Sequence, residues 1–393
     1  MDGGLPAGAL GGLPGRSFGV YVHVPFCATR CGYCDFNTYT PAELAGGGSV
    51  PAYVEAALAE VRLARQVLGE IDLPVSTVFF GGGTPTLLPA DAFGRILVAI
   101  DAGFGLVQGA EVTAEANPES VDPAYLHRLR GHGVNRISFG MQSARPHVLA
   151  VLDRRHTPGR PEECVAWARA AGFGSVSLDL IYGAPGESLA DWRASVEIAI
   201  AAAPDHVSAY ALVVEDGTGL AARVRRGELA APDDDDLADK YLLAVELLGA
   251  AGYRWYEVSN WARPGAACRH NLGYWRGGNW WGVGPGAHSH VGGVRWWNVK
   301  HPTAYAARLD QGRSPALARE VLSAADRRLE RVLLELRLSE GLPLAELAEV
   351  GRKAADRALS DGLLEPSAYA DGAAVLTLRG RLLADAVVRD LAD

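Results

Sequence analysis

The feature of this sequence that most restricts its fold is a regular alternation of short β-like runs with amphipathic helical segments. The alternation extends from Gly19 to about Val214 of the 393-residue chain. Segments 53–69 and 188–203 place their apolar residues at helical spacing. The six expected strands are Val20–Phe26, Ser76–Gly82, Glu111–Asn117, Arg136–Gln142, Ser175–Gly183 and His206–Leu212. This order predicts an α/β fold, a parallel sheet covered by helices with right-handed crossovers, as in a partial (β/α)6 barrel.

Residues that could bind a ligand or take part in chemistry follow the expected strands, at the strands' carboxyl ends. Three cysteines come after the first strand, and the glycine-rich run GGGTPT, residues 81–86, follows the second. Glu115, Gln142 and Asp179 stand near the ends of later strands. Catalytic and binding groups gather at the carboxyl ends of strands in such folds. We therefore expect all of these residues to face one mouth.

The three cysteines form a compact loop with the spacing Cys27-x3-Cys31-x2-Cys34. A [4Fe–4S] cluster normally takes four thiolates, so a site with three leaves one iron open to another ligand. A zinc loop is the alternative, but it favours paired C-x2-C ligands and needs a fourth protein ligand nearby. The other two cysteines, Cys164 and Cys268, lie far along the chain. Their roles stay open, although a buried thiol is the default for Cys164, which lies in a helical pattern.

Charge and hydropathy exclude several classes of protein. The formal net charge of −9 argues against a generic binder of nucleic acid or anionic membranes. Uninterrupted apolar runs stay below the ~18 residues that span a bilayer. Residues 1–17 lack the basic start and apolar run of a secretory signal, and we expect them to form a flexible tail. The odd number of cysteines fits reduced thiols, so a cytoplasmic location is predicted.

Beyond the alternating region, the sequence indicates an extension and a second domain. Residues 253–297 hold most of the tryptophans and suggest short strands and loops packed against a barrel. We expect the barrel with this extension to cover residues 18–300 and a mostly helical domain to cover 301–393. Residues 343–380 outline a winged helix, but residues 314–393 hold 11 Lys/Arg and 14 Asp/Glu. An accessory domain is favoured over a DNA-binding one, because binding a groove needs cations that neutralise phosphates.

The spacing of the cysteine loop makes the chain resemble the radical S-adenosylmethionine (SAM) superfamily, whose hallmark is C-x3-C-x2-C. The resemblance implies that the amino and carboxylate groups of SAM chelate the fourth iron, with Tyr33 beside the adenine. It also implies that the glycine-rich loop contacts the SAM amino group, since consecutive glycines let a backbone approach a ligand closely. The cofactor contacts that the resemblance implies are Tyr21, Tyr33, Gly82, Gly83, Thr84, Glu115, Gln142, Arg154 and Asp179. Arg155 is adjacent to Arg154 and competes for its role.

Within that superfamily the chain resembles the coproporphyrinogen III oxidase-like group over nearly its whole length. The motifs VYVHVPFC, FFGGGTPT, NPES, RISFGMQS, DLIYG and HNLGYW carry the match. The oxidases of this group have a longer N-terminal arm and a fourth cysteine where this chain has Phe36. The HemW heme chaperones have phenylalanine there, a short start and an HNxxYW motif. The resemblance therefore implies a chaperone that passes heme to a membrane-associated respiratory acceptor, with the oxidase as the alternative.

The HNLGYW motif, residues 270–275, also suggests a heme ligand. Imidazole is a common axial ligand of heme iron, and aromatic faces suit a porphyrin plane. His270 is the ligand that we predict, and Cys268 is a second candidate. The alternative is that His270 is a hydrogen-bonded structural residue, and further histidines follow soon after it. The glycine-rich run 282–290 fits either a turn or the lining of the same cavity.

Overall fold

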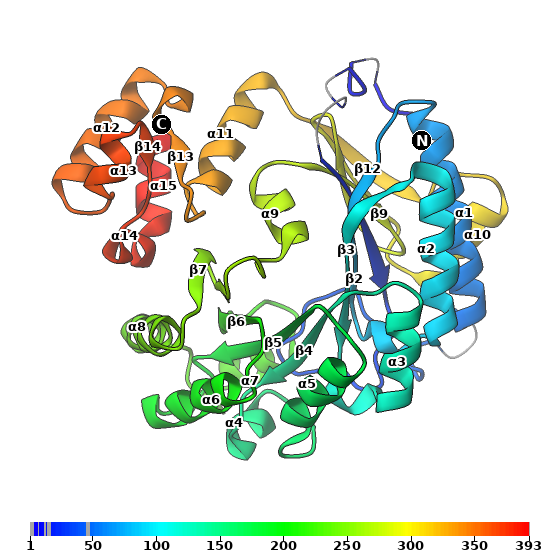
Figure 1. Cartoon of the computed structure of the whole chain (residues 1–393), viewed down its shortest axis with the longest axis horizontal. Coiled ribbons are helices and arrows are strands. Elements are labelled where there is room, and N and C mark those ends of the chain that lie inside the picture. Colours follow the sequence, from blue (N-terminus) through cyan, green and yellow to red (C-terminus); the bar gives the residue numbers. More distant parts are fainter. Residues whose placement is uncertain (1–3, 7, 12, 14–16, 45–47, 393) are drawn as a thin grey trace.

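The computed structural model describes residues 4–6, 8–11, 13, 17–44 and 48–392. It confirms all six predicted strands and their parallel pairing in sequence order. The sheet curves into an open arc with helices on its outer face (Figure 1). The six strands are β1 (Phe18–Val24), β2 (Val75–Gly82), β3 (Leu106–Ala116), β4 (Arg136–Gln142), β5 (Ser175–Tyr182) and β6 (His206–Ala211). The predicted partial (β/α)6 barrel is therefore confirmed.

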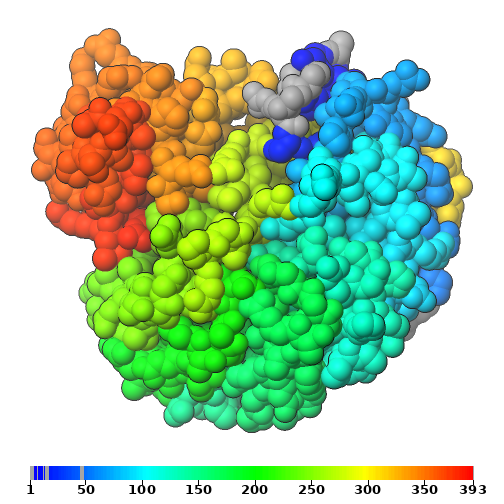
Figure 2. Space-filling view, viewed as in Figure 1, coloured from blue at the N-terminus to red at the C-terminus, as the bar shows by residue number. Residues whose placement is uncertain are grey.

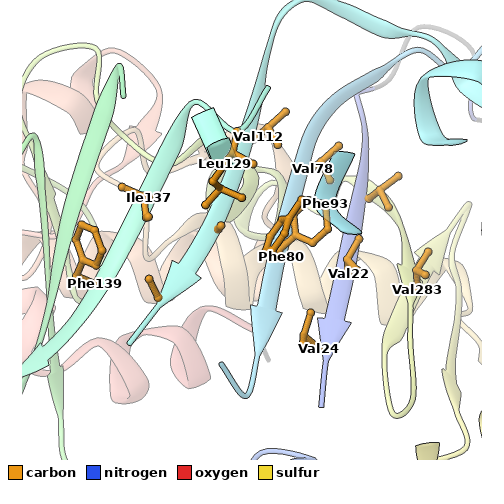
Figure 3. Close-up of a cluster of buried hydrophobic side chains, with 14 of the residues drawn as sticks. Val22, Val24, Val78, Phe80, Phe93, Val112, Leu129, Ile137, Phe139 and Val283 are labelled. Atoms are coloured by element: carbon orange, nitrogen blue, oxygen red, sulfur yellow. The ribbon is translucent and has the colours of Figure 1, made fainter. Parts of the chain in front are cut away.

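Helices cover the arc because alternate strand residues present apolar side chains to its outer face. In Figure 3, Val22, Val78 and Phe80 pack with Phe93 of the second helix, and the Phe80 and Phe93 ring centroids are 4.6 Å apart. The helices of this region are α1 (Val50–Leu68), α2 (Ala90–Phe104), α3 (Pro123–Gly131), α4 (Pro146–Val151), α5 (Arg160–Ala170), α6 (Leu189–Ala201), α7 (Gly219–Arg225) and α8 (Asp234–Ala250). Short 3-10 turns, Pro85–Leu87 and Pro118–Ser120, follow β2 and β3.

The aromatic-rich segment extends the sheet at both edges. β9 (Asn279–Val283) pairs parallel with β1 and is followed by the antiparallel strands β10 (His288–Val291), β11 (Val294–Asn298) and β12 (Ala316–Val321). At the other edge, β8 (Asn260–Ala262) pairs with β6 and with β7 (Arg254–Glu257). Helix α9 (Arg269–Trp275) connects the two extensions. The segment is thus part of the sheet itself as well as packed against it.

A buried carboxylate on α1 ties the segment beyond residue 300 to the barrel. Glu60 is fully buried and accepts hydrogen bonds from the Gly284 amide at 2.8 Å, from Asn298 Nδ2 at 2.7 Å and from the Tyr305 hydroxyl at 2.6 Å. Burial raises the pKa of Glu60 to about 7. Tyr305 belongs to α10 (Pro302–Asp310), which packs on α1. The expected domain boundary at residue 300 therefore falls too early, because α10 and β12 belong to the barrel.

A second hydrophobic core defines the C-terminal domain, which begins at α11 (Ala324–Glu335). This domain forms a separate lobe beside the barrel (Figure 2). Its other elements are β13 (Leu342–Pro343), the 3-10 turn Leu344–Glu346, α12 (Glu349–Ser360), α13 (Pro366–Ala370), β14 (Ala373–Ala374), α14 (Leu378–Leu382) and α15 (Ala384–Ala392). The mostly helical character is confirmed. The winged-helix outline is met only in part: α13 lies where the hairpin of the wing would be, and strand pairing among the described residues of this domain is limited to β13 with β14 and a bridge from Leu364 to Leu376.

The described part of the expected N-terminal tail is packed. Ala9 and Leu13 are buried in the barrel core, and Arg319 donates to the Gly4 carbonyl at 2.7 Å. These residues are therefore not a free tail. Residues 1–3, 7, 12 and 14–16 of that segment lie outside the described residues.

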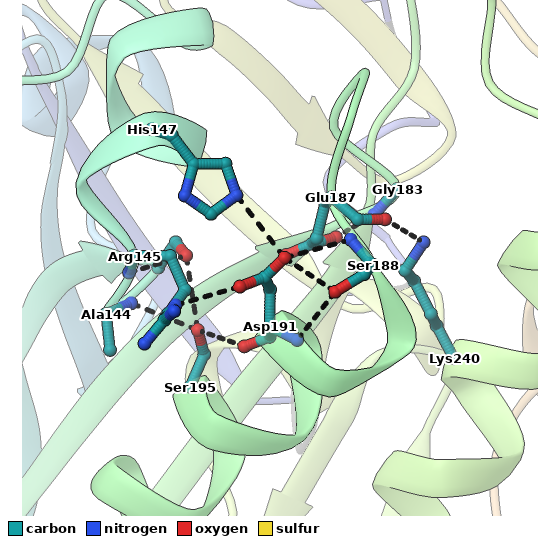
Figure 4. A network of polar contacts seen from close by, with 10 residues as sticks. Ala144, Arg145, His147, Gly183, Glu187, Ser188, Asp191, Ser195 and Lys240 are labelled. Carbon is teal, nitrogen blue, oxygen red and sulfur yellow. Dashed lines mark hydrogen bonds and ion pairs between the residues drawn. The ribbon is translucent and has the colours of Figure 1, made fainter.

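A polar network fixes the turns beside β4 and β5 (Figure 4). Asp191 caps α6 through Ser188 and accepts from Arg145 Nε at 2.8 Å. Lys240 of α8 is fully buried, and its ammonium donates to the Glu187 carbonyl at 2.9 Å. The network joins α4, α6 and α8 behind the ends of the two strands.

Among the described helices, none combines the length and the apolar character that crossing a bilayer requires.

Candidate functional site

A cavity of about 570 Å³ opens at the carboxyl ends of the parallel strands, and we call it the mouth cavity. It brings together the three loop cysteines, every cofactor contact that the resemblance implies and both candidate heme ligands, His270 and Cys268. The candidate residues that line it are Tyr21, Cys27, Cys31, Tyr33, Cys34, Gly82, Gly83, Thr84, Glu115, Gln142, Arg154, Asp179 and His270. They come from all parts of the barrel, so the predicted common mouth exists.

The cysteine loop is held in place by backbone hydrogen bonds from several elements. The Cys27 amide donates to the Tyr39 carbonyl at 3.0 Å, and Gly32 bonds both to Leu152 after α4 and to Leu220 in α7. Asn37 Nδ2 donates to the carbonyl groups of Pro285 and Lys300. The glycine-rich run 282–290 therefore forms a turn that supports the loop. All three loop thiols are free and partly exposed.

The donor set on this loop fits an iron–sulfur cluster. Within the described ranges, no three His, Cys, Asp or Glu side chains converge as they would around one metal ion. Each thiolate of a [4Fe–4S] cube binds a different iron, so the three sulfurs need not converge. Thr84 Oγ1 and Arg154 Nη1 lie 4.0 and 3.8 Å from the sulfurs of Cys27 and Cys31. Burial raises the pKa of Cys34 to about 11, so the metal itself must favour the thiolate form.

The glycine-rich loop lies against the cysteine loop more closely than any side chain would allow. Gly82 has φ +109°, which favours glycine. A Cβ on Gly83 would stand 2.4 Å from the Phe26 carbonyl oxygen and 2.9 Å from Cys27 Sγ. The amides of Gly83 and Thr84 donate to the carbonyl groups of Val24 and Phe26 at 2.8 and 2.7 Å.

This close approach predicts the effect of adding one methyl group. Gly83→Ala is expected to push the two loops apart, to lower cluster content and to destabilise the fold by about 1–3 kcal/mol. Gly103→Ala on α2 is the matched control, because a Cβ there meets nothing within 4 Å. Iron content and urea unfolding measure both variants. Equal results for the two would contradict the close approach.

Two carboxyl groups, from β3 and β5, face the cavity. Glu115 Oε2 accepts from the Gly82 amide at 3.2 Å, and Asp179 Oδ2 accepts from Ser138 at 2.7 Å. Burial first, and then the charge of Asp179, raises the pKa of Glu115 to about 8. Burial also raises the pKa of Asp179. Carboxyl groups in such surroundings favour a ligand with positive charge, such as a sulfonium.

Gln142 and Arg154 form the third side of the cavity. Gln142 ends β4 with φ 63°, a left-handed conformation that a glutamine rarely takes. Arg154 Nη2 donates to the Gly140 carbonyl at 2.7 Å, while its buried Nε has no hydrogen-bond partner among the described atoms. Arg155 lines a different cavity, so Arg154 is the arginine at this site.

His270 closes the cavity on the side of β2. Its Nδ1 lies 2.8 Å from Thr77 Oγ1, and its Nε2 lies 2.8 Å from the Tyr274 hydroxyl. Burial lowers the pKa of His270 to about 3, so the ring is neutral. Its assignment as an axial ligand stays a prediction, and coordination would require breaking one of these two hydrogen bonds.

The two isolated cysteines are buried. Cys268 donates to Glu111 Oε1 at 3.6 Å, and burial raises its pKa to about 12. Cys164 donates to the Pro118 carbonyl at 3.5 Å. Both thiols have structural hydrogen bonds, and Cys164 does not line the mouth cavity.

Sequence reasoning missed several residues of the cavity. Ser138 and Ser208 both donate to Asp179, and Tyr210 lines the cavity beyond Ser208. The alternation of side chains along a strand could have identified them. Ser138 lies on the same face of β4 as Gly140 and Gln142, and Ser208 lies on the same face of β6 as Tyr210.

An open parallel barrel with three cysteines on the loop after its first strand is the arrangement of the radical SAM superfamily. The family profile described as "Radical SAM superfamily" matches residues 21–199. A heme chaperone HemW from Mycobacterium tuberculosis is 56% identical over 97% of this chain and 96% of its own length. HemW from Escherichia coli is 36% identical over 88% of this chain and 91% of its own length. The chain belongs to the HemW family of radical SAM proteins.

A solved structure supports the same architecture. Coproporphyrinogen III oxidase (HemN) from E. coli, a radical SAM enzyme, superposes with a TM-score of 0.81 over 98% of this chain and 91% of its own. Its sequence identity to this chain is 22%. This likeness therefore concerns the fold.

Proposed function

We propose that this protein is a cytoplasmic heme chaperone that binds heme and passes it to an acceptor, a membrane-associated respiratory protein. The observation that carries the proposal is the 56% identity to a protein named heme chaperone HemW, over 97% of the chain. Phe36 adds support, because it replaces the additional cysteine of the oxidases that the chain resembles. Its side chain is 59% exposed at the rim of the mouth cavity.

The residues of the mouth cavity fit a cluster with SAM. Cys27, Cys31 and Cys34 would hold a [4Fe–4S] cluster, whose open iron accepts the amino and carboxylate groups of SAM. Glu115 and Asp179 would face the positively charged sulfonium of that ligand, and Arg154 would offer its free Nε to a carboxylate or hydroxyl. Tyr33 and the backbone of Gly82, Gly83 and Thr84 would enclose it. Tyr21 lies beside Phe79 and His270 and would limit the depth of the site.

Two assays on anaerobically reconstituted protein test this function. We expect hemin to bind stoichiometrically and to move to a heme-free acceptor protein, followed by the Soret band after the two are separated. Incubation with coproporphyrinogen III, SAM and a reductant is expected to give no protoporphyrinogen. Repeated turnover of coproporphyrinogen III would identify the oxidase instead, and failure to bind hemin would refute the chaperone.

A further inference from the structure

A second cavity of about 810 Å³ lies at the opposite end of the barrel, and we call it the base cavity. The amino ends of β1 and β2 form its floor, and α9, the β9–β10 hairpin and α11 of the C-terminal domain form its walls. Figure 1 shows α9 between the C-terminal domain and the sheet. Its volume is within the range of cofactor pockets, about 300–1,000 Å³. It shares His270 and Tyr274 with the mouth cavity, but the residues that line it include none of the cysteine loop.

His290 lines the base cavity in the arrangement typical of a metal-binding imidazole. Its Nδ1 lies 2.8 Å from the Gly278 carbonyl oxygen. Because a carbonyl only accepts, the proton must be on Nδ1, and Nε2 keeps a free lone pair. Nε2 has no hydrogen-bond partner among the described atoms. Burial lowers the pKa of His290, which keeps the ring neutral. His270, in contrast, has both ring nitrogens in hydrogen bonds.

Aromatic and aliphatic side chains form the wall next to His290. The Trp280 indole packs on the His290 ring at a centroid distance of 5.2 Å, and Tyr274 meets Trp280 edge to face at 4.5 Å. Leu272 and Leu334 add apolar surface from α9 and α11. Such a wall suits a flat, apolar ring system.

The rim of the base cavity has uncompensated positive charge. Its acidic residues are all paired: Glu330 with Arg295 at 2.6 Å, and Glu335 and Glu346 with Arg331 at 2.8 and 2.7 Å. Arg327 and Arg328 of α11 are exposed and make no ion pair with any described residue. Two free guanidinium groups beside an apolar wall favour a ligand that carries carboxylates on a flat ring.

We propose that the base cavity is the heme site, with His290 Nε2 as the axial ligand, Trp280 on the porphyrin face and Arg327 and Arg328 on the propionates. This inference rests on the proposed function and locates its cargo. Because Nε2 is shielded from water, coordination requires a local movement of the rings around His290. The site lies away from the cysteine loop, so cargo and cluster are held separately.

Titration of the reconstituted full-length protein with hemin and with iron-free protoporphyrin tests the site. His290→Ala is expected to abolish the Soret shift of hemin, to leave iron-free porphyrin binding unchanged and to recover the shift when imidazole is added. Arg327→Glu and Arg328→Glu are each expected to weaken both ligands about tenfold, the loss of a charge-assisted bond. Arg357→Glu on α12, outside the cavity, is the matched control and should not change binding.

The outcomes separate the site from the function. If wild-type protein binds hemin but the His290 and arginine variants bind it equally well, the base cavity is not the site, while the chaperone function stands. Loss of the Soret shift in His270→Ala but not in His290→Ala would likewise overturn the assignment. If wild-type protein does not bind hemin, both the site and the proposed function are refuted. Cluster content, measured as iron and sulfide, should be equal in wild type and in the His290 and arginine variants.

Discussion

Cys31→Ala is expected to remove the iron–sulfur cluster completely. Wild-type protein should hold ~4 iron and ~4 sulfide per chain after anaerobic reconstitution, because its three loop thiolates each bind one iron of a [4Fe–4S] cluster. With one of them missing, two thiolates on a partly exposed loop cannot retain it. Iron and acid-labile sulfide analysis together with visible absorption measure the loss.

Cys164→Ala is the control for the loss of a thiol as such. That thiol is buried, donates to the Pro118 carbonyl and lies outside the mouth cavity, so its removal should leave iron and sulfide unchanged. Stoichiometric zinc without sulfide in the wild-type protein would contradict the cluster and favour a zinc loop.

Glu60→Ala is expected to lower the free energy of unfolding by about 3–5 kcal/mol. The change leaves three buried donors, the Gly284 amide, Asn298 Nδ2 and the Tyr305 hydroxyl, without their acceptor. It also opens a cavity where α1 meets α10 and β11. Urea unfolding followed by circular dichroism measures the difference.

Glu55→Ala on the same helix is the matched control. Glu55 is exposed and pairs only with Arg95 at the surface, so its loss should cost less than about 0.5 kcal/mol. If the two variants unfold at the same urea concentration, Glu60 does not join the barrel to its extension.

Much of the barrel follows from local patterns in the sequence. The period of two in the strands and the helical spacing between them give the order β1 to β6, and the carboxyl-end rule places Glu115, Gln142 and Asp179 in one cavity. The cysteine loop is local in sequence, so its spacing alone indicates its chemistry. These features depend on neighbouring residues, which is why the sequence predicts them.

Features that depend on distant residues were not predictable in the same way. A barrel that ends at residue 300 leaves out Tyr305, whose contact with Glu60 arises only in three dimensions. The base cavity joins His290 with Arg327 across a domain boundary, and no motif spans that distance. The partner of each ring nitrogen, which separates His270 from His290, likewise requires the folded structure.

The position of β1 between β2 and β9 has a consequence for biosynthesis. The strand that precedes the cysteine loop pairs on one side with residues 75–82 and on the other with residues 279–283. During translation, β1 therefore keeps one edge open until most of the chain has left the ribosome, and open edges attract other strands. A fragment ending at residue 199 would keep that open edge permanently. The strand that carries the cysteine loop is thus fully paired only after residues 279–283 have been made and β9 has covered β1.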